Sequence, residues 1–195
     1  MQLWLPEGLA NPLGKRMLAL MFVRLLVLAL LLGIIAAYYL REVVLGDFSS
    51  TFLVGTVAVA FLLSAVFLVW MRSGKHLEPL AHAQLVLDQL TWTAMVYLSG
   101  GVTSGSSSLY GLSCLSGVIL LGSAGALSSA LAGMLSYLAL SLAFAYGVVL
   151  PPPDQSTSAY VVDGQAMVYP VFSTLMATGL VAMLAIYLAE RLRTT

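Results

Sequence analysis

The sequence predicts an all-α, polytopic integral membrane protein, a bundle of six transmembrane helices with both termini in the cytoplasm. Its composition leads to this class. Of the 195 residues, 61% are hydrophobic and only 8% are charged, whereas soluble domains carry roughly 25% charged residues. Eight acidic and eight basic residues cannot cover the surface of a soluble protein of this size, so the main solvent of the chain must be lipid.

Six apolar segments account for the predicted helices. The clearest comprises residues 51–70, whose 20 residues span about 30 Å as a helix, the thickness of a bilayer core. The fourth segment is short, since its 13 residues reach only about 20 Å. In chain order the segments are residues 24–40, 51–70, 80–98, 109–121, 124–149 and 168–189. They form a membrane domain over residues 24–189, between a cytoplasmic segment at 1–23 and the start of a signalling helix at 190–195.

The distribution of Lys and Arg indicates that the fourth segment crosses the membrane. With six crossings and a cytoplasmic N-terminus, only Arg41 lies outside, as the excess of Lys and Arg in cytoplasmic loops requires. If the fourth segment did not cross, Arg191 and Arg193 would move outside as well. The basic residues expected on the cytoplasmic side are Lys15, Arg16, Arg24, Arg72, Lys75, Arg191 and Arg193.

Two connections have unusual compositions. The first, Gly100–Ser108, contains three Gly, four Ser and a Thr and carries no charge; we call it the hinge. Gly permits sharp turns, and Ser hydroxyls can satisfy the backbone groups at helix ends, so we expect a tight hairpin on the non-cytoplasmic side. The second begins with three Pro at residues 151–153, which should stop the fifth helix there.

The third segment is the most polar and contains most of the candidate binding residues. Gln84, Asp88 and Trp92 are four residues apart and Thr91 lies on the adjoining strip, which predicts a polar stripe facing the interior of the bundle. A mid-helix Asp costs roughly 2.5–3.5 kcal/mol on insertion scales, so shielding from lipid is expected. Two interpretations of Asp88 remain open. It is either a proton-linked or signal-coupling group, or a carboxyl that joins helices through hydrogen bonds.

The fifth segment carries small residues on one side. Gly125, Ser129 and Gly133 recur at every fourth position. This spacing is typical of helices that approach each other closely, either within one chain or across a dimer.

Several classes of function find no support in the sequence. It contains no phosphate-binding loop, dinucleotide fingerprint or nucleophile elbow. The single cysteine, Cys114, can form neither an internal disulfide nor a metal site. Because no basic tract is present, no nucleic-acid partner is expected. We therefore expect no cofactor, no bound metal and no catalytic residue.

A family resemblance covers residues 80–150. Residues 85–112 read LVLDQLTWTAMVYLSGGVTSGSSSLYGL. This stretch resembles the membrane-sensor part of PilS/NtrB-type bacterial sensor histidine kinases, in which a helix with a mid-span Asp ends in a double glycine before a hydroxyl-rich turn. The matching positions are Asp88, Val96–Gly101, Ser104, Leu109 and Tyr110. The chain departs from the family at Gly105, where Pro is common, and at Ser106–Ser108, where a Phe is usual.

The resemblance implies a signal-input domain in the bacterial inner membrane. A membrane lipid or the transmembrane helix of a partner, such as a pilin subunit, would bind in an outer-leaflet pocket closed by the hinge. Members of the family continue into dimerising and ATPase domains, so the chain is expected to be either the sensor part of a kinase that is homodimeric at full length or a short stand-alone relative, and in both cases not itself catalytic. The expected ligand contacts are Gln84, Asp88, Thr91, Trp92, Gly100, Gly101, Ser104 and Tyr110, and the expected relay residues are Glu190, Arg191 and Arg193.

Two alternatives from other classes remain. The chain could be a small transporter or channel subunit with Asp88 in a proton or cation path. It could equally be a scaffold subunit of a membrane complex, in which Asp88 contributes only to stability.

Overall fold

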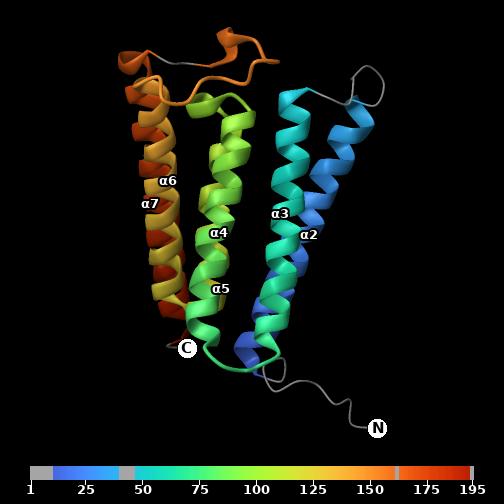
Figure 1. Cartoon of the computed structure of the whole chain (residues 1–195). Coiled ribbons are helices and arrows are strands. Elements are labelled where there is room, and N and C mark those ends of the chain that lie inside the picture. The colour runs from blue at the N-terminus through green and yellow to red at the C-terminus, as the bar shows by residue number, and fades with distance from the viewer. Residues whose placement is uncertain (1–10, 40–46, 161–162, 194–195) are drawn as a thin grey trace. The chain divides into compact units, whose positions relative to one another are not determined.

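The computed structural model describes residues 11–39, 47–160 and 163–193, and over these ranges the chain is helical and contains no strand. It divides into two compact units, residues 1–81 and 82–195, and each is described by itself. The elements, drawn in Figure 1, are α2 (Pro12–Tyr39), α3 (Phe48–Met71), α4 (Leu77–Leu98), η1 (Gly101–Thr103), η2 (Gly105–Ser108), α5 (Leu109–Leu121), α6 (Ser123–Ala145), η3 (Thr157–Ala159) and α7 (Gly164–Arg193).

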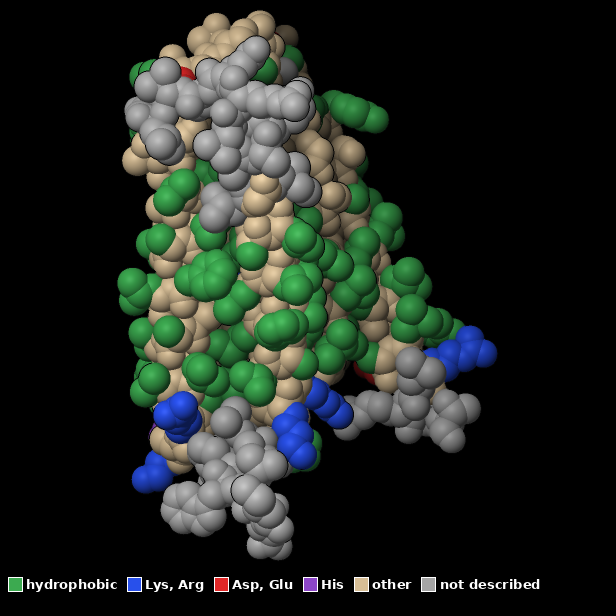
Figure 2. Space-filling model, turned by 90° about the vertical axis from the view of Figure 1, so that its right-hand side faces the viewer, with side chains coloured by type: hydrophobic (Ala, Val, Ile, Leu, Met, Phe, Trp, Pro, Cys, Tyr) green, Lys and Arg blue, Asp and Glu red, His purple; other side chains and the backbone are tan. Residues whose placement is uncertain are grey.

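The all-α class is confirmed, and each of the six predicted segments corresponds to one of the helices α2 to α7. Among the described residues, α3, α6 and α7 are long and apolar enough to span a bilayer, and a shorter apolar segment runs from Gly105 to Leu121. With 22 residues, α4 is also long, but its amide and carboxyl side chains make it less apolar. Figure 2 shows hydrophobic side chains along the helices and basic side chains near helix ends.

Two predicted helix ends differ from the structure. The helix α2 begins at Pro12, well before the predicted start of the first segment at residue 24. The helix α6 ends at Ala145 rather than at residue 149, because Gly147 takes a left-handed φ of 67°. The N–H groups of Gly147 and Val148 donate to the carbonyls of Phe144 and Ala143, the bonding pattern of a Schellman cap. Glycine therefore stops this helix before the prolines are reached.

In the first unit, α2 and α3 form a helical hairpin with a regular seam. The buried residues of α3 alternate in spacings of four and three residues, and those of α2 follow the same rhythm. This spacing is that of a coiled-coil seam, in which each buried side chain enters a gap on the facing helix. The residues are Leu53, Val57, Ala60, Ser64, Phe67 and Met71 on α3, and Met17, Met21, Arg24 and Leu28 on α2.

Arg24 occupies one of the seam positions. It is only 6% exposed, and its Nη2 donates to the Ala60 carbonyl at 3.2 Å and to Ser64 Oγ at 3.3 Å. A charged group in a seam that is otherwise apolar except for Ser64 fixes the register of the two helices. The cytoplasmic position expected for Arg24 stays a prediction, and the structure adds that the residue lies within the α2–α3 contact. Arg41, the one basic residue expected outside, falls beyond the described residues.

In the second unit, α5 and α6 form a hairpin around the turn at Gly122 and touch through glycines. A Cβ atom on Gly125 would collide with the carbonyl oxygen of Gly117, and one on Gly117 would collide with that of Gly125. Gly125, Ser129 and Gly133 are all buried. The small-residue side of the fifth segment therefore serves close packing within the chain.

The last helix, α7, packs on this hairpin. Val181 lies against Gly111 of α5, where an added Cβ would meet its side chain at 3.4 Å. Cys114, Ala130 and Ala182 form a buried apolar cluster that joins α5, α6 and α7, with Val181 packed against it. Small side chains at these positions keep the three helices close together.

We predict that Gly125→Ala destabilises the protein by about 1–3 kcal/mol, the usual cost of overpacking, because the added methyl group has no space beside Gly117. Unfolding in mixed micelles measures this free energy. Gly55→Ala is the matched control, since nothing lies within 4 Å of its added Cβ. Equal stability of the two variants would contradict the described α5–α6 contact.

Candidate functional site

Gln89 of α4 lies at the centre of a set of polar side chains inside the second unit. We call this set the polar core; it consists of Gln89, Thr93, Tyr110, Ser129 and Tyr137. Gln89 is completely buried. Its Nε2 donates to Ser129 Oγ at 2.7 Å and to the Ser129 carbonyl at 2.9 Å. Gly133 makes room for it, because a Cβ there would lie 3.1 Å from the Gln89 amide. The Gln89 Oε1 has no hydrogen-bond partner among the described residues, so the amide is held through its nitrogen.

The polar core continues from Tyr110 to the hinge. The Tyr110 hydroxyl is 2.8 Å from Thr93 Oγ1 on α4, and its ring packs edge-on against Tyr137 of α6, with centroids 5.7 Å apart. The Tyr137 hydroxyl donates to the carbonyl oxygen of Val102 at 2.7 Å. One continuous set of contacts therefore joins α4, α5, α6 and η1.

The predicted stripe on α4 is only partly buried. Gln84 and Trp92 are buried, and the Trp92 indole donates to Ser113 Oγ on α5 at 2.8 Å. Thr91 is half-buried and bonds to a carbonyl one turn back on its own helix. Asp88 is also half-buried and has interactions of its own. Fully buried polar side chains on this helix thus include Gln84 and, next to Asp88, Gln89.

The hinge is an ordered turn. Gly100 and Gly101 take left-handed φ angles of 118° and 63°, which only glycine adopts easily. Buried Ser104 caps η2, since its Oγ accepts from the Ser106 N–H at 3.0 Å and lies 2.5 Å from Ser99 Oγ. A side chain on Gly101 would press against Phe144 and Tyr160. Gly100, Gly101 and Ser104 therefore shape the turn from α4 into α5.

The loop between α6 and α7 covers this turn. Gln155 Nε2 donates to the Leu98 carbonyl at 2.8 Å. The Tyr160 hydroxyl lies 3.0 Å from the Tyr97 carbonyl, 3.2 Å from the Leu98 carbonyl and 2.9 Å from Gln155 Oε1. The Gln155 amide satisfies the Leu98 carbonyl, and the single Tyr160 hydroxyl hydrogen serves one of its three nearby acceptors, so the loop supplies partners to carbonyls at the end of α4 that have none within the helix. Burial raises the pKa of Tyr160 above 10.0, so the phenol stays protonated and remains a donor.

A groove of about 260 Å³ lies where η2 and α5 meet α7. Five of its eight lining residues carry a hydroxyl group, and two others are Gly and Ala. We call it the hydroxyl groove. None of the eight predicted ligand contacts lines it, although it begins at the last two residues of the hinge. Its lining residues are Ser107, Ser108, Gly111, Ser173, Thr174, Ala177, Thr178 and Val181.

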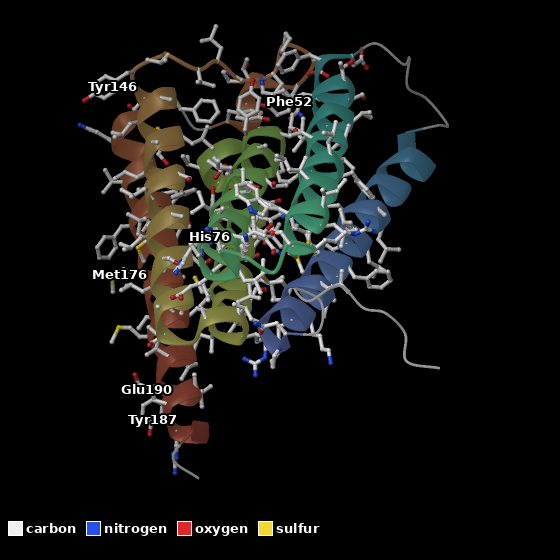
Figure 3. All side chains as sticks on the ribbon, turned by 60° about the horizontal axis from the view of Figure 1, so that its bottom comes forward. Phe52, His76, Tyr146, Met176, Tyr187 and Glu190 are labelled. Carbon is white, nitrogen blue, oxygen red and sulfur yellow. The ribbon has the colours of Figure 1, made fainter. Side chains whose placement is uncertain are left out.

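The predicted relay residues lie at the other end of α7. Figure 3 shows the Glu190 and Tyr187 side chains beside each other on the final turns, and Arg191 reaches Tyr187 Oη at 3.5 Å. Glu190 and Arg191 are exposed. Arg193 is the last residue of α7, and its side chain lies outside the described part of the structure.

Sequence reasoning missed two sets of residues. Gln89 adjoins Asp88, and its pairing with Ser129 follows only when α4 and α6 are placed side by side. Ser173, Thr174 and Thr178 are hydroxyl residues in an otherwise apolar segment, and this pattern was the available signal for a polar contact in the membrane. In the part of the chain that the structure describes, His, Cys, Asp and Glu form no group able to hold a metal ion.

We predict that Tyr160→Phe accelerates amide hydrogen exchange in the hinge roughly fivefold, because losing a hydroxyl that bonds buried carbonyls costs about 1 kcal/mol. Exchange monitored by mass spectrometry on peptides around residues 97–104 measures the effect. Tyr146→Phe is the control, since Tyr146 is 80% exposed. Unchanged exchange in Tyr160→Phe would show that the loop does not hold the turn.

No curated protein and no solved structure matches this chain. A family model described as a PilS-like transmembrane domain matches residues 8–195, which includes every helix described above. The polar core, the hinge and α7 all lie inside this match, and so does the stretch that resembles the family in sequence. The chain therefore belongs to the family of PilS-like transmembrane domains, which are multi-pass membrane domains.

Proposed function

We propose that this membrane domain is the signal-input part of a two-component sensor histidine kinase in the bacterial inner membrane. It detects a membrane-borne ligand and relays the event along α7 to cytoplasmic domains. Membership in the PilS-like family supports a sensor role. Phosphoryl transfer would belong to a kinase core, which would also make the assembly a homodimer, and this domain would contribute neither a catalytic residue nor a cofactor.

The hydroxyl groove is the observation that carries the proposal. The groove combines hydroxyl groups with small residues, and both kinds of residue favour contact with another transmembrane helix. Small residues allow backbones to approach, and interhelical hydrogen bonds in lipid contribute about 0.6 kcal/mol on average. Because Ser173 and Ala177 of α7 are exposed, an incoming helix can reach them. We therefore favour a partner transmembrane helix with small or hydroxyl-bearing residues, such as that of a pilin subunit, over a soluble ligand.

The groove is placed so that an occupant touches the output helix directly. Thr174, which lines it, interacts with Tyr137 of the polar core, and Val181 packs against α5. Pro170 lies within α7 just before the groove and removes one backbone hydrogen bond, which makes this part of the helix easier to bend.

The length of α7 supports transmission. Its 30 residues extend about 45 Å, compared with a hydrocarbon core of about 30 Å. The helix is thus longer than the core, and because charged side chains avoid the hydrocarbon region, its final turns with Glu190, Arg191 and Arg193 are expected to lie beyond it. An occupant shifts the equilibrium between two positions of α7 only if it binds one of them better.

We predict that Ala177→Trp, which fills the groove, abolishes the response of a fused kinase core to its signal. Met183→Trp is the matched control, because Met183 is 70% exposed on the same helix and does not line the groove. Autophosphorylation of the fusion in cells with and without the partner protein measures the response. If both variants respond like the parent, the groove is not the input site.

A further inference from the structure

A second hollow lies in the first unit, away from the hydroxyl groove. It follows the α2–α3 hairpin, has a volume of about 620 Å³, and is lined by α2 from Lys15 to Leu25 and by α3 from Phe61 to Leu68. We call it the hairpin furrow. All of its lining residues except Lys15 and Ser64 are apolar. The exposed rings of Phe22 and Phe61 stand along it, 68% and 43% exposed.

The furrow has the length of one acyl chain in one leaflet. The ten residue steps from Lys15 to Leu25 rise about 15 Å along the helix, which is half of a bilayer core of about 30 Å. A neighbouring hollow of about 630 Å³ runs along the adjacent face of α3 from Leu62 to Ser73. Ala65 lines both hollows and forms only a low ridge between them. Two parallel hollows divided by a small residue fit the two chains of one phospholipid.

Basic side chains gather where both hollows end. Lys15 lines the furrow and Arg16 is its neighbour. The bonds of Arg24 to Ala60 and Ser64 set an antiparallel register, so Lys15, nine residues before Arg24, lies level with the end of α3 near Arg72. Lys75 follows Arg72 in the connection after α3. The side chains of Lys15, Arg16, Arg72 and Lys75 are all exposed. Among the described residues, the acidic residue nearest in sequence to Arg72 and Lys75 is Glu78, at the start of α4.

We propose that the α2–α3 hairpin binds an anionic phospholipid, with its acyl chains in the two hollows on either side of Ala65 and its phosphate at Lys15. The two apolar hollows have the length needed to hold the acyl chains. The positive charge at their common end favours a negatively charged head group. Each Lys or Arg near an anionic membrane surface contributes about 1 kcal/mol. This site is independent of the proposed input function, because it uses residues of the first unit only.

The test uses the full chain in nanodiscs that contain a photoactivatable phosphatidylglycerol or the corresponding phosphatidylcholine. Mass spectrometry then maps the cross-links. We expect phosphatidylglycerol to label the α2 and α3 residues of the hollows more strongly than phosphatidylcholine. Lys15→Gln should reduce this preference about fivefold, the equivalent of ~1 kcal/mol. Arg191→Gln, the same charge change on α7, should leave it unchanged.

A second pair of variants separates the fit of the chains from the charge. Ala65→Trp should remove the label by filling both hollows, whereas Ala58→Trp, an exposed α3 position outside them, should retain it. Equal labelling by the two lipids, or a preference that survives Lys15→Gln, would overturn the anionic site. Labelling that survives Ala65→Trp would overturn the placement of the chains.

Discussion

The hydrogen bonds between Gln89 and Ser129 are the contact on which the placement of α4 in the second unit depends. Lipid offers no partner to an amide, so a polar side chain in a membrane helix must find its partner inside the protein. Ser129 provides both a hydroxyl and a backbone carbonyl, and Gly133 leaves the space that the amide needs. This requirement fixes α4 against α6, and through Thr93, Tyr110 and Tyr137 it also fixes the hinge. An apolar core could be packed in many rotations of the helices, whereas this set of bonds permits few.

The structure separates residues that shape the fold from residues that can meet a partner. Gly101, Ser104 and Tyr110 are buried in or beside the hinge turn. Gln155 and Tyr160 of the α6–α7 loop cover that turn. The open hydroxyl groups lie one step further along the chain, at Ser107 and Ser108, facing α7. A rigid turn beside an accessible groove is compatible with the proposed sensor role, in which an occupant would displace α7 rather than the turn.

Much of the fold follows from local patterns in the sequence. Apolar length predicted the six helices, and small residues at every fourth position predicted the close contact at Gly125. The position of Asp88 was predicted less well, since a spacing of four selects Gln84, Asp88 and Trp92, while the structure buries Gln89 more deeply than Asp88. Neighbouring helical positions are 100° apart, so only the facing helix, with its Ser129 and Gly133, decides which of them points inward. The hydroxyl groove, and the contacts of Gln155 and Tyr160 with the end of α4, join residues more than 50 positions apart in sequence. No local sequence pattern reveals such contacts.

A double-mutant cycle on Gln89 and Ser129 tests the central contact most directly. The free energies of unfolding of Gln89→Leu, Ser129→Ala and the double variant would be measured in mixed micelles. If the amide and the hydroxyl stabilise each other across α4 and α6, the double variant loses less than the sum of the two single losses, by about 0.6–1.7 kcal/mol. Strictly additive losses would contradict the account, because they would mean that the two side chains contribute independently and that something else holds α4 in place.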